Sequence, residues 1–516
     1  MTEHIDIICV YDNDHFSAPI EYTFALILST LDVRYKVMSL RQLRQEGGYP
    51  HKALFISYTR DFVDLGAEKQ IHIYASGFFG KNYLKPDSLP PIPLKKYNGL
   101  PVIYHGHGDY EAWVRKSEGL IETNIDIIAS SFFMISRYEE VVLDIKDEHD
   151  RFPASASLAF KENFLERPIV NEYIELLWSW VHSLEPGLER KPLWPENEEF
   201  TVCLTHDVDT VQMYKLSLMA GAALDRIKLF LMPNTKQKTK QINPQAETRL
   251  SLLRSIRVKD AFYLMCDWMK VMLKLKKDPH DTFDYMLNLE QEYGFKSSFY
   301  FMAGGDSSFD NCYSIAEPRV KKLVKQIEVR GNEVGLHSSY NSYDNPEQMT
   351  QEKAKLDNVA ASKDYGCRQH YLRWKVPSTW RFQEQAGLLY DTTLSFADHA
   401  GFRCGICLPF KPFDIMENRE LDIWELPLIV QEGTLKCTNY HNLSPEEAYK
   451  EMVELIQAVK KCHGVFVLLW HNSSFDSLIG WAGGKELYER LMEYISEQNA
   501  WVTSGREIVE WWEERR

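Results

Sequence analysis

The sequence predicts an α/β protein in which a smaller N-terminal α/β domain precedes a parallel sheet or barrel. From about residue 199 to residue 510, short β-prone runs alternate with helical segments, a pattern typical of parallel sheets. Residues 1 to 150 show a similar but separate alternation. Between the two regions, Pro186, Pro192 and Pro195 indicate a linker. We therefore expect an N-terminal domain with its linker over residues 1–190 and a second domain over 197–516.

Composition is that of a globular protein long enough for two or three domains. The chain has 516 residues, of which 44% are hydrophobic and 26% charged. A formal charge of −15 argues against nucleic acid as a partner. The first residues contain no basic stretch followed by an apolar core, and no run approaches the roughly 18 apolar residues of a membrane span. The nine scattered cysteines are typical of reduced thiols. We expect a cytoplasmic protein.

The N-terminal region alternates four strands with helices. Strands are predicted at Ile5–Val10, Ala53–Tyr58, Ile71–Ala75 and Val102–His105, and helices at 19–31, 110–121 and 168–183. After the fourth strand, His105, His107 and Asp109 have a spacing that allows metal binding, although a polar turn is the more ordinary interpretation.

In the second domain, helices are predicted at 281–293, 316–330, 346–363, 444–461 and 483–497. A basic helical insertion at about 212–277 interrupts this domain, with 14 Lys and Arg residues against 4 Asp and Glu residues. Within it, residues 257–277 resemble an amphipathic helix. Two interpretations stay open: a helix docked on its own domain, or a peripheral contact with anionic lipid or a lipid-linked substrate.

The most informative stretch is the apolar run from Phe200 to Leu204, which is followed by Asp207 and Asp209. Residues two apart on a strand share a face, so both carboxylates can point the same way at the end of a strand. An acidic turn is the alternative.

Polar residues recur where the later strands end. His337 and His471 each terminate a predicted strand, Arg373 and Lys375 follow another, and Asp391 lies within a further one. A barrel brings all its strand ends to one face. Carboxylates and imidazoles gathered there favour metal-assisted hydrolysis, in which one carboxylate accepts a proton from water and a histidine protonates the leaving group.

Thr205-His206-Asp207-Val208-Asp209 and Leu468-Leu469-Trp470-His471 resemble the first and last motifs of the polysaccharide deacetylase superfamily, the NodB-homology or carbohydrate esterase family 4 fold. This resemblance implies a distorted (β/α) barrel that holds a divalent metal ion, with zinc expected and cobalt, nickel or manganese as alternatives. It also implies that Asp207 is the general base, Asp209 a metal ligand and His471 the general acid.

The middle motifs match less closely. His337 matches the first histidine of H-x-x-x-H, but Asn341 replaces the second, so the third ligand is Asn341, water or another residue such as His399. Arg373-Trp374-Lys375-Val376-Pro377-Ser378 is similar to the R-x-P-[YF] motif. By that resemblance Arg373 or Lys375 would keep the base ionised and the Ser378 amide would bind the oxyanion. Asp391 lies in a segment similar to the Y-D-S-S strand of several branches.

The arrangement also resembles a branch of the superfamily that carries a domain of unknown function first, including the run from Phe132 to Glu140. We expect a metal-dependent hydrolase that removes an N- or O-acyl group from a carbohydrate during cytoplasmic assembly of a surface polysaccharide or glycolipid. Two alternatives are an amide hydrolase acting on a non-sugar and a non-catalytic binding or scaffold module.

Overall fold

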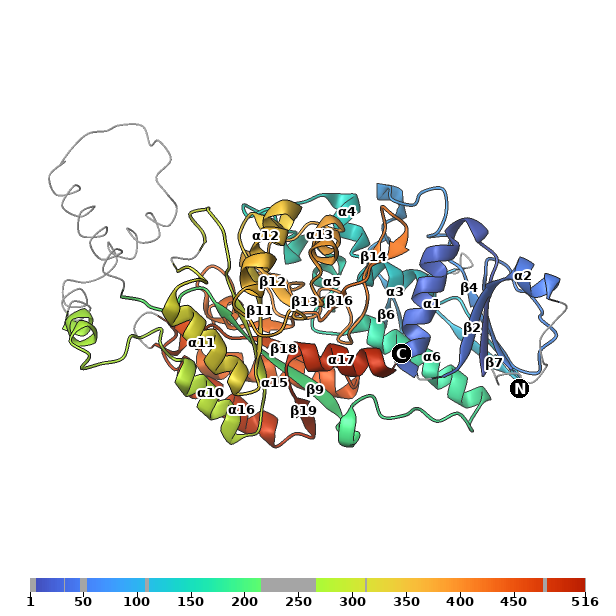
Figure 1. The fold of residues 1–516 in the computed structure, drawn as a ribbon. Coiled ribbons are helices and arrows are strands. Elements are labelled where there is room, and N and C mark those ends of the chain that lie inside the picture. The colour runs from blue at the N-terminus through green and yellow to red at the C-terminus, as the bar shows by residue number, and fades with distance from the viewer. Residues whose placement is uncertain are drawn as a thin grey trace.

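A computed structural model describes residues 6–31, 33–46, 53–106, 111–214, 266–310, 313–476 and 480–515. Two sheets organise these residues, one in each half of the chain, and Figure 1 shows them side by side along the length of the molecule. Most of the predicted basic insertion, together with His107 and Asp109, lies outside the described residues.

The N-terminal sheet has the strand order β2-β1-β3-β4-β8-β7. Its strands are β1 (Ile7–Tyr11), β2 (Tyr35–Ser39), β3 (Leu54–Thr59), β4 (Gln70–Tyr74), β7 (Val114–Ser117) and β8 (Leu120–Thr123). All neighbours are parallel except β7 and β8. Strands β1, β3 and β4 are buried along their whole length, as expected for a parallel sheet covered on both faces. Its helices are α1 (Ser17–Leu31), α2 (Leu40–Gln45), α3 (Ile127–Ile135), α4 (Tyr138–Leu143), α5 (Leu158–Lys161) and α6 (Ile169–Leu184).

The helix predicted at 110–121 is wrong. Residues 114–123 form the antiparallel hairpin of β7 and β8. Gly119 lies in its two-residue turn with φ +68, and a side chain there would meet the Glu68 carbonyl. The sequence Val-Arg-Lys-Ser-Glu-Gly-Leu-Ile-Glu-Thr contains a Gly-bearing turn between two short strands, which is a hairpin signal. The predicted strand at Val102–His105 is also displaced, because β6 spans Leu100–Val102 and pairs with β5 (Lys95–Tyr97).

The C-terminal sheet is parallel and curled, and it forms the distorted (β/α) barrel that the sequence predicted. Its strand order is β16-β13-β12-β11-β10-β9-β18-β17, and β19 also pairs with β9. The bounds are β9 (Phe200–Val208), β10 (Ser297–Phe301), β11 (Glu333–Ser338), β12 (Cys367–Gln369), β13 (Tyr390–Asp391), β16 (Trp424–Glu425), β17 (Val430–Gln431), β18 (Val465–Leu469) and β19 (Ala500–Val502). Among the described residues, no strand pairing joins β16 to β17 to close the barrel.

The C-terminal helices follow the predicted alternation with the strands. They are α10 (Phe283–Glu292), α11 (Pro318–Val329), α12 (Pro346–Asp357), α13 (Ser378–Ala386), α14 (Glu432–Lys436), α15 (Pro445–Lys461), α16 (Gly484–Ser496) and α17 (Gly505–Arg515). A capping box begins α15: the Ser444 hydroxyl accepts from the Glu447 amide, and the Glu447 carboxylate accepts from the Ser444 amide.

Strand β9 is the central strand of this sheet. It pairs with β10 and β18 along its length and with β19 at its start, and all nine of its residues are buried. The strand continues through Asp207 to Val208, so Asp207 belongs to the sheet and not to an acidic turn.

A buried contact joins the two halves of the protein. The Tyr22 ring of α1 and the Phe132 ring of α3 both pack against Phe413, a residue of β14 (Phe413–Asp414). Beside them, the Arg403 guanidinium donates to the Glu140 carboxylate of α4 at 2.7 and 2.9 Å. The Arg137 guanidinium also donates to Glu140 and to the Arg403 carbonyl. One continuous apolar core therefore runs through both halves, while the domain boundary near residue 190 stays a prediction.

No helix in the described part of the chain is both long and apolar enough to cross a membrane.

Neutralising Glu140 should destabilise the protein strongly. We expect Glu140→Gln to lower the free energy of unfolding by about 3–5 kcal/mol, because the buried Arg403 guanidinium loses its counter-charge and Arg137 keeps only its pair with Glu139. Glu172→Gln is the control: Glu172 pairs with Arg167 nearer the surface, where an ion pair contributes less than about 1 kcal/mol. Urea unfolding of both variants measures the difference, and equal losses would contradict a special role for the buried pair.

Candidate metal centre

Asp209 follows directly after β9 and provides the first group of the candidate centre. Its side chain is 37% exposed, whereas its Oδ1 atom is buried and lacks a hydrogen-bond partner. Burial raises the pKa of Asp209, but the surrounding histidines His337, His370 and His471 outweigh burial and hold it well below its usual range.

His337 of β11 provides the second group. Its Nδ1–H donates to the Arg368 carbonyl at 2.9 Å, which fixes the tautomer and leaves the Nε2 lone pair facing Asp209 Oδ1 at 3.2 Å. A hydrogen bond from the second ring nitrogen is the usual support of a metal-ligating histidine.

His370 provides the third group. It follows β12 directly, and its Nε2 lies 3.6 Å from Asp209 Oδ1. Asp310 Oδ1 lies 3.7 Å from its Nδ1 on the other side of the ring. Asp209, His337 and His370 each offer a ligand atom, and these atoms all lie within 4.8 Å of one another.

The geometry of these three groups fits a divalent metal ion. Two ligand atoms at about 2.1 Å from a tetrahedral zinc ion lie about 3.4 Å apart. The observed separations of 3.2 and 3.6 Å bracket that value. Asp209 Oδ1 and His337 Nε2 are also buried atoms without hydrogen-bond partners, a state that a bound cation relieves. Two imidazoles and one carboxylate are a donor set that suits zinc.

The third ligand is therefore better provided by His370 than by Asn341 or His399. Asn341 is exposed, and its Oδ1 accepts from the Arg373 guanidinium at 3.2 Å. His399 faces Asp398, and its ring makes an edge-to-face contact with Phe160. Sequence reasoning missed His370 because it looked for the second histidine within the His337 segment. The available signal was a histidine placed directly after the short strand Cys367–Gln369.

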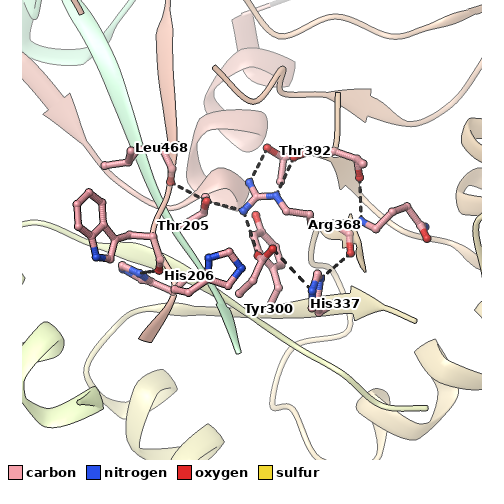
Figure 2. A network of polar contacts seen from close by, with 12 residues as sticks. Thr205, His206, Tyr300, His337, Arg368, Thr392 and Leu468 are labelled. Atoms are coloured by element: carbon pink, nitrogen blue, oxygen red, sulfur yellow. Dashed lines mark hydrogen bonds and ion pairs between the residues drawn. The ribbon is translucent and has the colours of Figure 1, made fainter. Parts of the chain in front are cut away.

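Arg368 holds Asp207, and Figure 2 shows the same guanidinium contacting Thr205 and Thr392. The buried Arg368 guanidinium donates to Asp207 Oδ1 at 3.1 Å and to the Thr205 hydroxyl at 2.7 Å. It also donates to the carbonyl and hydroxyl of Thr392. Burial lowers the pKa of Arg368, but the Asp207 charge outweighs burial and raises it.

The structure places neither Arg373 nor Lys375 beside Asp207. The Arg373 guanidinium donates to Asp150 Oδ2 at 2.7 Å, and Lys375 pairs with Asp344 on the surface. The prediction that one of them holds Asp207 is wrong, because both follow β12 and point towards the rim, whereas Arg368 lies within β12 and points into the barrel.

Two further candidates lie away from the centre. Ser378 begins α13, and its hydroxyl donates to the Lys375 carbonyl. Asp391 of β13 is fully buried, and its carboxylate accepts hydrogen bonds from the Gln383 and Thr393 side chains. These contacts indicate a structural role for Asp391. Burial raises the pKa of Asp391.

His471 faces the centre from the opposite side. Its Nε2 lies 3.7 Å from Asp209 Oδ2, and its Nδ1–H donates to Glu432 Oε1 at 2.8 Å. Burial lowers the pKa of His471, but the Glu432 carboxylate outweighs burial and raises it to about 9. His471 is therefore protonated at neutral pH. Glu432, a buried residue of α14, was missed because nothing in its local sequence connects it to His471.

Comparison with protein families and solved structures gives one family match. The model described as "Family of unknown function (DUF7033)" matches residues 8–186. No curated protein matches the chain.

Solved structures that match are of low similarity. A protein from Mycobacterium smegmatis named as a polysaccharide deacetylase is 15% identical, with a TM-score of 0.39, and the match covers 62% of this chain and 93% of that one. A structure from Pseudomonas aeruginosa PAO1, also named as a polysaccharide deacetylase, is 13% identical. The match covers 63% of this chain and 95% of that one, with a TM-score of 0.39. The PuuE allantoinase is 13% identical. The match covers 63% of this chain and 94% of that one, and the TM-score is 0.39. At these TM-scores the likenesses carry no argument about this chain, so the site is argued from its own geometry.

Removing the third ligand should abolish tight metal binding. We expect His370→Ala to weaken zinc affinity by more than about 100-fold, since even second-shell changes cost about 10–100-fold. Asn341→Ala should leave the affinity unchanged, because Asn341 lies outside the group of three. Competition with a chromogenic chelator measures both, and a loss confined to Asn341→Ala would contradict this assignment.

Proposed function

We propose that this protein is a metal-dependent hydrolase that removes an N- or O-acyl group, most simply acetyl, from a carbohydrate. The observation that supports this most directly is the placing of two oppositely charged groups around the three metal-binding side chains. Asp207 accepts from the Arg368 guanidinium, and the His471 Nδ1–H donates to the Glu432 carboxylate. Hydrolysis of an amide or ester requires one group that accepts a proton from water and another that donates a proton to the leaving group.

In the proposed mechanism, Asp209, His337 and His370 hold a divalent ion. That ion, when bound, acidifies water and polarises the acyl carbonyl. Asp207 accepts the proton of the attacking water through its carboxylate, and the hydrogen bond from Arg368 orients that carboxylate. His471 then donates its Nε2 proton to the departing nitrogen or oxygen, while Glu432 holds the imidazole in place. Zinc is the proposed ion, and cobalt, nickel or manganese would fit the same donors.

A second candidate, a non-catalytic binding or scaffold module, loses its main support. It rested on the absence of a second histidine at Asn341, and His370 offers an imidazole instead. A hydrolase of non-sugar amides uses the same residues, so the substrate distinguishes it from the proposed function. We place the reaction in cytoplasmic assembly of a surface polysaccharide or glycolipid as part of the same proposal.

Changing the proposed base should stop the reaction without removing the metal. We expect Asp207→Asn to lower kcat on an acetylated amino sugar about 100- to 10,000-fold, the usual contribution of general base catalysis. Lys375→Ala is the control and should leave kcat unchanged, because Lys375 pairs only with Asp344 at the surface. Acetate release and zinc content measure both variants. Full activity of Asp207→Asn, or activity of the wild type on small amides alone, would contradict the carbohydrate proposal.

A peripheral membrane contact is a further part of the proposal. The described end of the insertion exposes four apolar side chains, which are Met269, Met272, Leu273 and Leu275. Four exposed lysines lie in the same stretch, which are Lys270, Lys274, Lys276 and Lys277. Exposed apolar and basic groups together suit an anionic lipid surface.

We expect the protein to float with vesicles that contain phosphatidylserine and not with neutral phosphatidylcholine vesicles. Exchanging Leu273 and Leu275 for glutamate should abolish flotation, whereas exchanging Val329, which is 78% exposed on α11, should not. Equal recovery with both kinds of vesicle would contradict the contact.

A further inference from the structure

A segment of the N-terminal half, Asp147 to Arg151, lies against the rim of the metal centre. The Asp150 carboxylate accepts from Arg373, and the His149 ring contacts the Tyr340 hydroxyl at 2.9 Å. This segment follows α4, whose Glu140 carboxylate accepts from the Arg403 guanidinium of the barrel half. The N-terminal half therefore reaches the end of the barrel where the metal-binding residues lie.

Arg151 connects this segment to two parts of the barrel. It is buried, and its guanidinium donates to Asp147 within its own segment. It also donates to the Tyr371 carbonyl at 3.0 Å and to the Tyr440 hydroxyl at 3.3 Å. One side chain thus fixes the turn after β12 and the loop after α14.

The turn that Arg151 holds is strained and carries a metal-binding side chain. Tyr371 and Leu372 have φ values of +61 and +52, in the left-handed region that non-glycine residues rarely adopt. Such conformations are strained and persist where the surroundings fix them. His370 directly precedes them, so the contact from Arg151 to the Tyr371 carbonyl helps to fix His370.

Arg151 contacts two partly exposed tyrosines, Tyr371 in this turn and Tyr440 in the loop after α14. The Tyr371 ring lies 4.8 Å from the His370 ring and is 38% exposed, and the Tyr440 ring is 37% exposed. Behind Tyr371 stand the rings of His149 and Phe309, at 5.0 and 5.3 Å. These contacts make Tyr371 a supported ring with one open side. Aromatic rings with a polar edge suit a ligand that has both apolar faces and hydroxyl groups, as a sugar ring has.

We propose that the N-terminal half completes the active site: Arg151 is a positioning residue for His370, and Tyr371 and Tyr440 form a saccharide-binding platform beside the metal centre. The platform rests on the proposed carbohydrate substrate, whereas the positioning role of Arg151 does not.

The chain offers a matched control for Arg151. Arg167 also lies in the N-terminal half, where its guanidinium donates to a carboxylate, Glu172, and to a main-chain carbonyl, that of Gly99. It contacts a carboxylate and a carbonyl as Arg151 does, but at a more exposed position (38% against 9%) and without touching the barrel turn. A comparison of the two separates loss of the contact to the barrel turn from loss of an arginine side chain elsewhere in the N-terminal half.

The first experiment measures cobalt(II) affinity of the full-length protein by chelator competition and the visible spectrum of the bound ion. We expect Arg151→Met to weaken affinity about 10- to 100-fold and to change the spectrum, as loss of a second-shell contact does. Arg151→Lys should recover part of the affinity through one hydrogen bond to the Tyr371 carbonyl. Arg167→Met should match the wild type. Unchanged affinity in Arg151→Met, or an equal loss in Arg167→Met, would overturn the positioning role.

The second experiment measures binding of N-acetylated chitotetraose by calorimetry. We expect Tyr371→Ala and Tyr440→Ala each to raise Kd about 10-fold, the scale of one aromatic contact. Tyr293→Ala is the control, because Tyr293 has the same 37% exposure but lies after α10. No binding by the wild type, or equal effects of all three variants, would overturn the platform. If chitotetraose binds as expected but no acyl group is released, the proposed function fails while the platform stands.

Discussion

A guanidinium buried inside the barrel is the interaction on which the candidate centre depends. Arg368 of β12 donates to Asp207 and Thr205 of β9 and to Thr392 after β13, while its own carbonyl accepts from His337 of β11. One residue therefore sets the orientation of a carboxylate and of a metal-binding imidazole on two different strands. An unpaired charge at such depth would cost several kcal/mol, so Arg368 and Asp207 each require the other.

Two pairs of oppositely charged side chains lie beside the candidate centre. On one side Asp207 faces a permanent cation, and on the other His471 faces the buried carboxylate of Glu432. Asp209 lies between them, and the surrounding imidazoles lower its pKa. Under the proposed function, Asp207 would be the proton acceptor and His471 the proton donor beside the candidate metal centre, as metal-assisted hydrolysis requires.

The N-terminal half is structurally part of the same molecule and not an appended module. Its core is continuous with that of the barrel, and the ion pairs of Glu140 with Arg137 and Arg403 are buried in the contact. The segment around Arg151 extends this contact to the rim of the centre. A change in the N-terminal half can therefore alter both the stability of the fold and the shape of the site.

The sequence by itself determined the alternation of strands and helices in the barrel and the positions of Asp207, Asp209, His337 and His471. These follow from local patterns, because an apolar run that ends in a polar residue marks a strand end wherever it occurs. It did not predict the hairpin at 114–123, where a short charged segment was assigned to a helix.

Only the tertiary structure decided which residues complete the centre. Arg368 meets Asp207 across 161 residues of sequence, and Glu432 meets His471 across 39. His370 takes the place expected of Asn341 because it directly follows the neighbouring strand β12 and does not lie further along the His337 segment. Pairings between strands depend on sheet order and register, and the local sequence of either partner does not encode them.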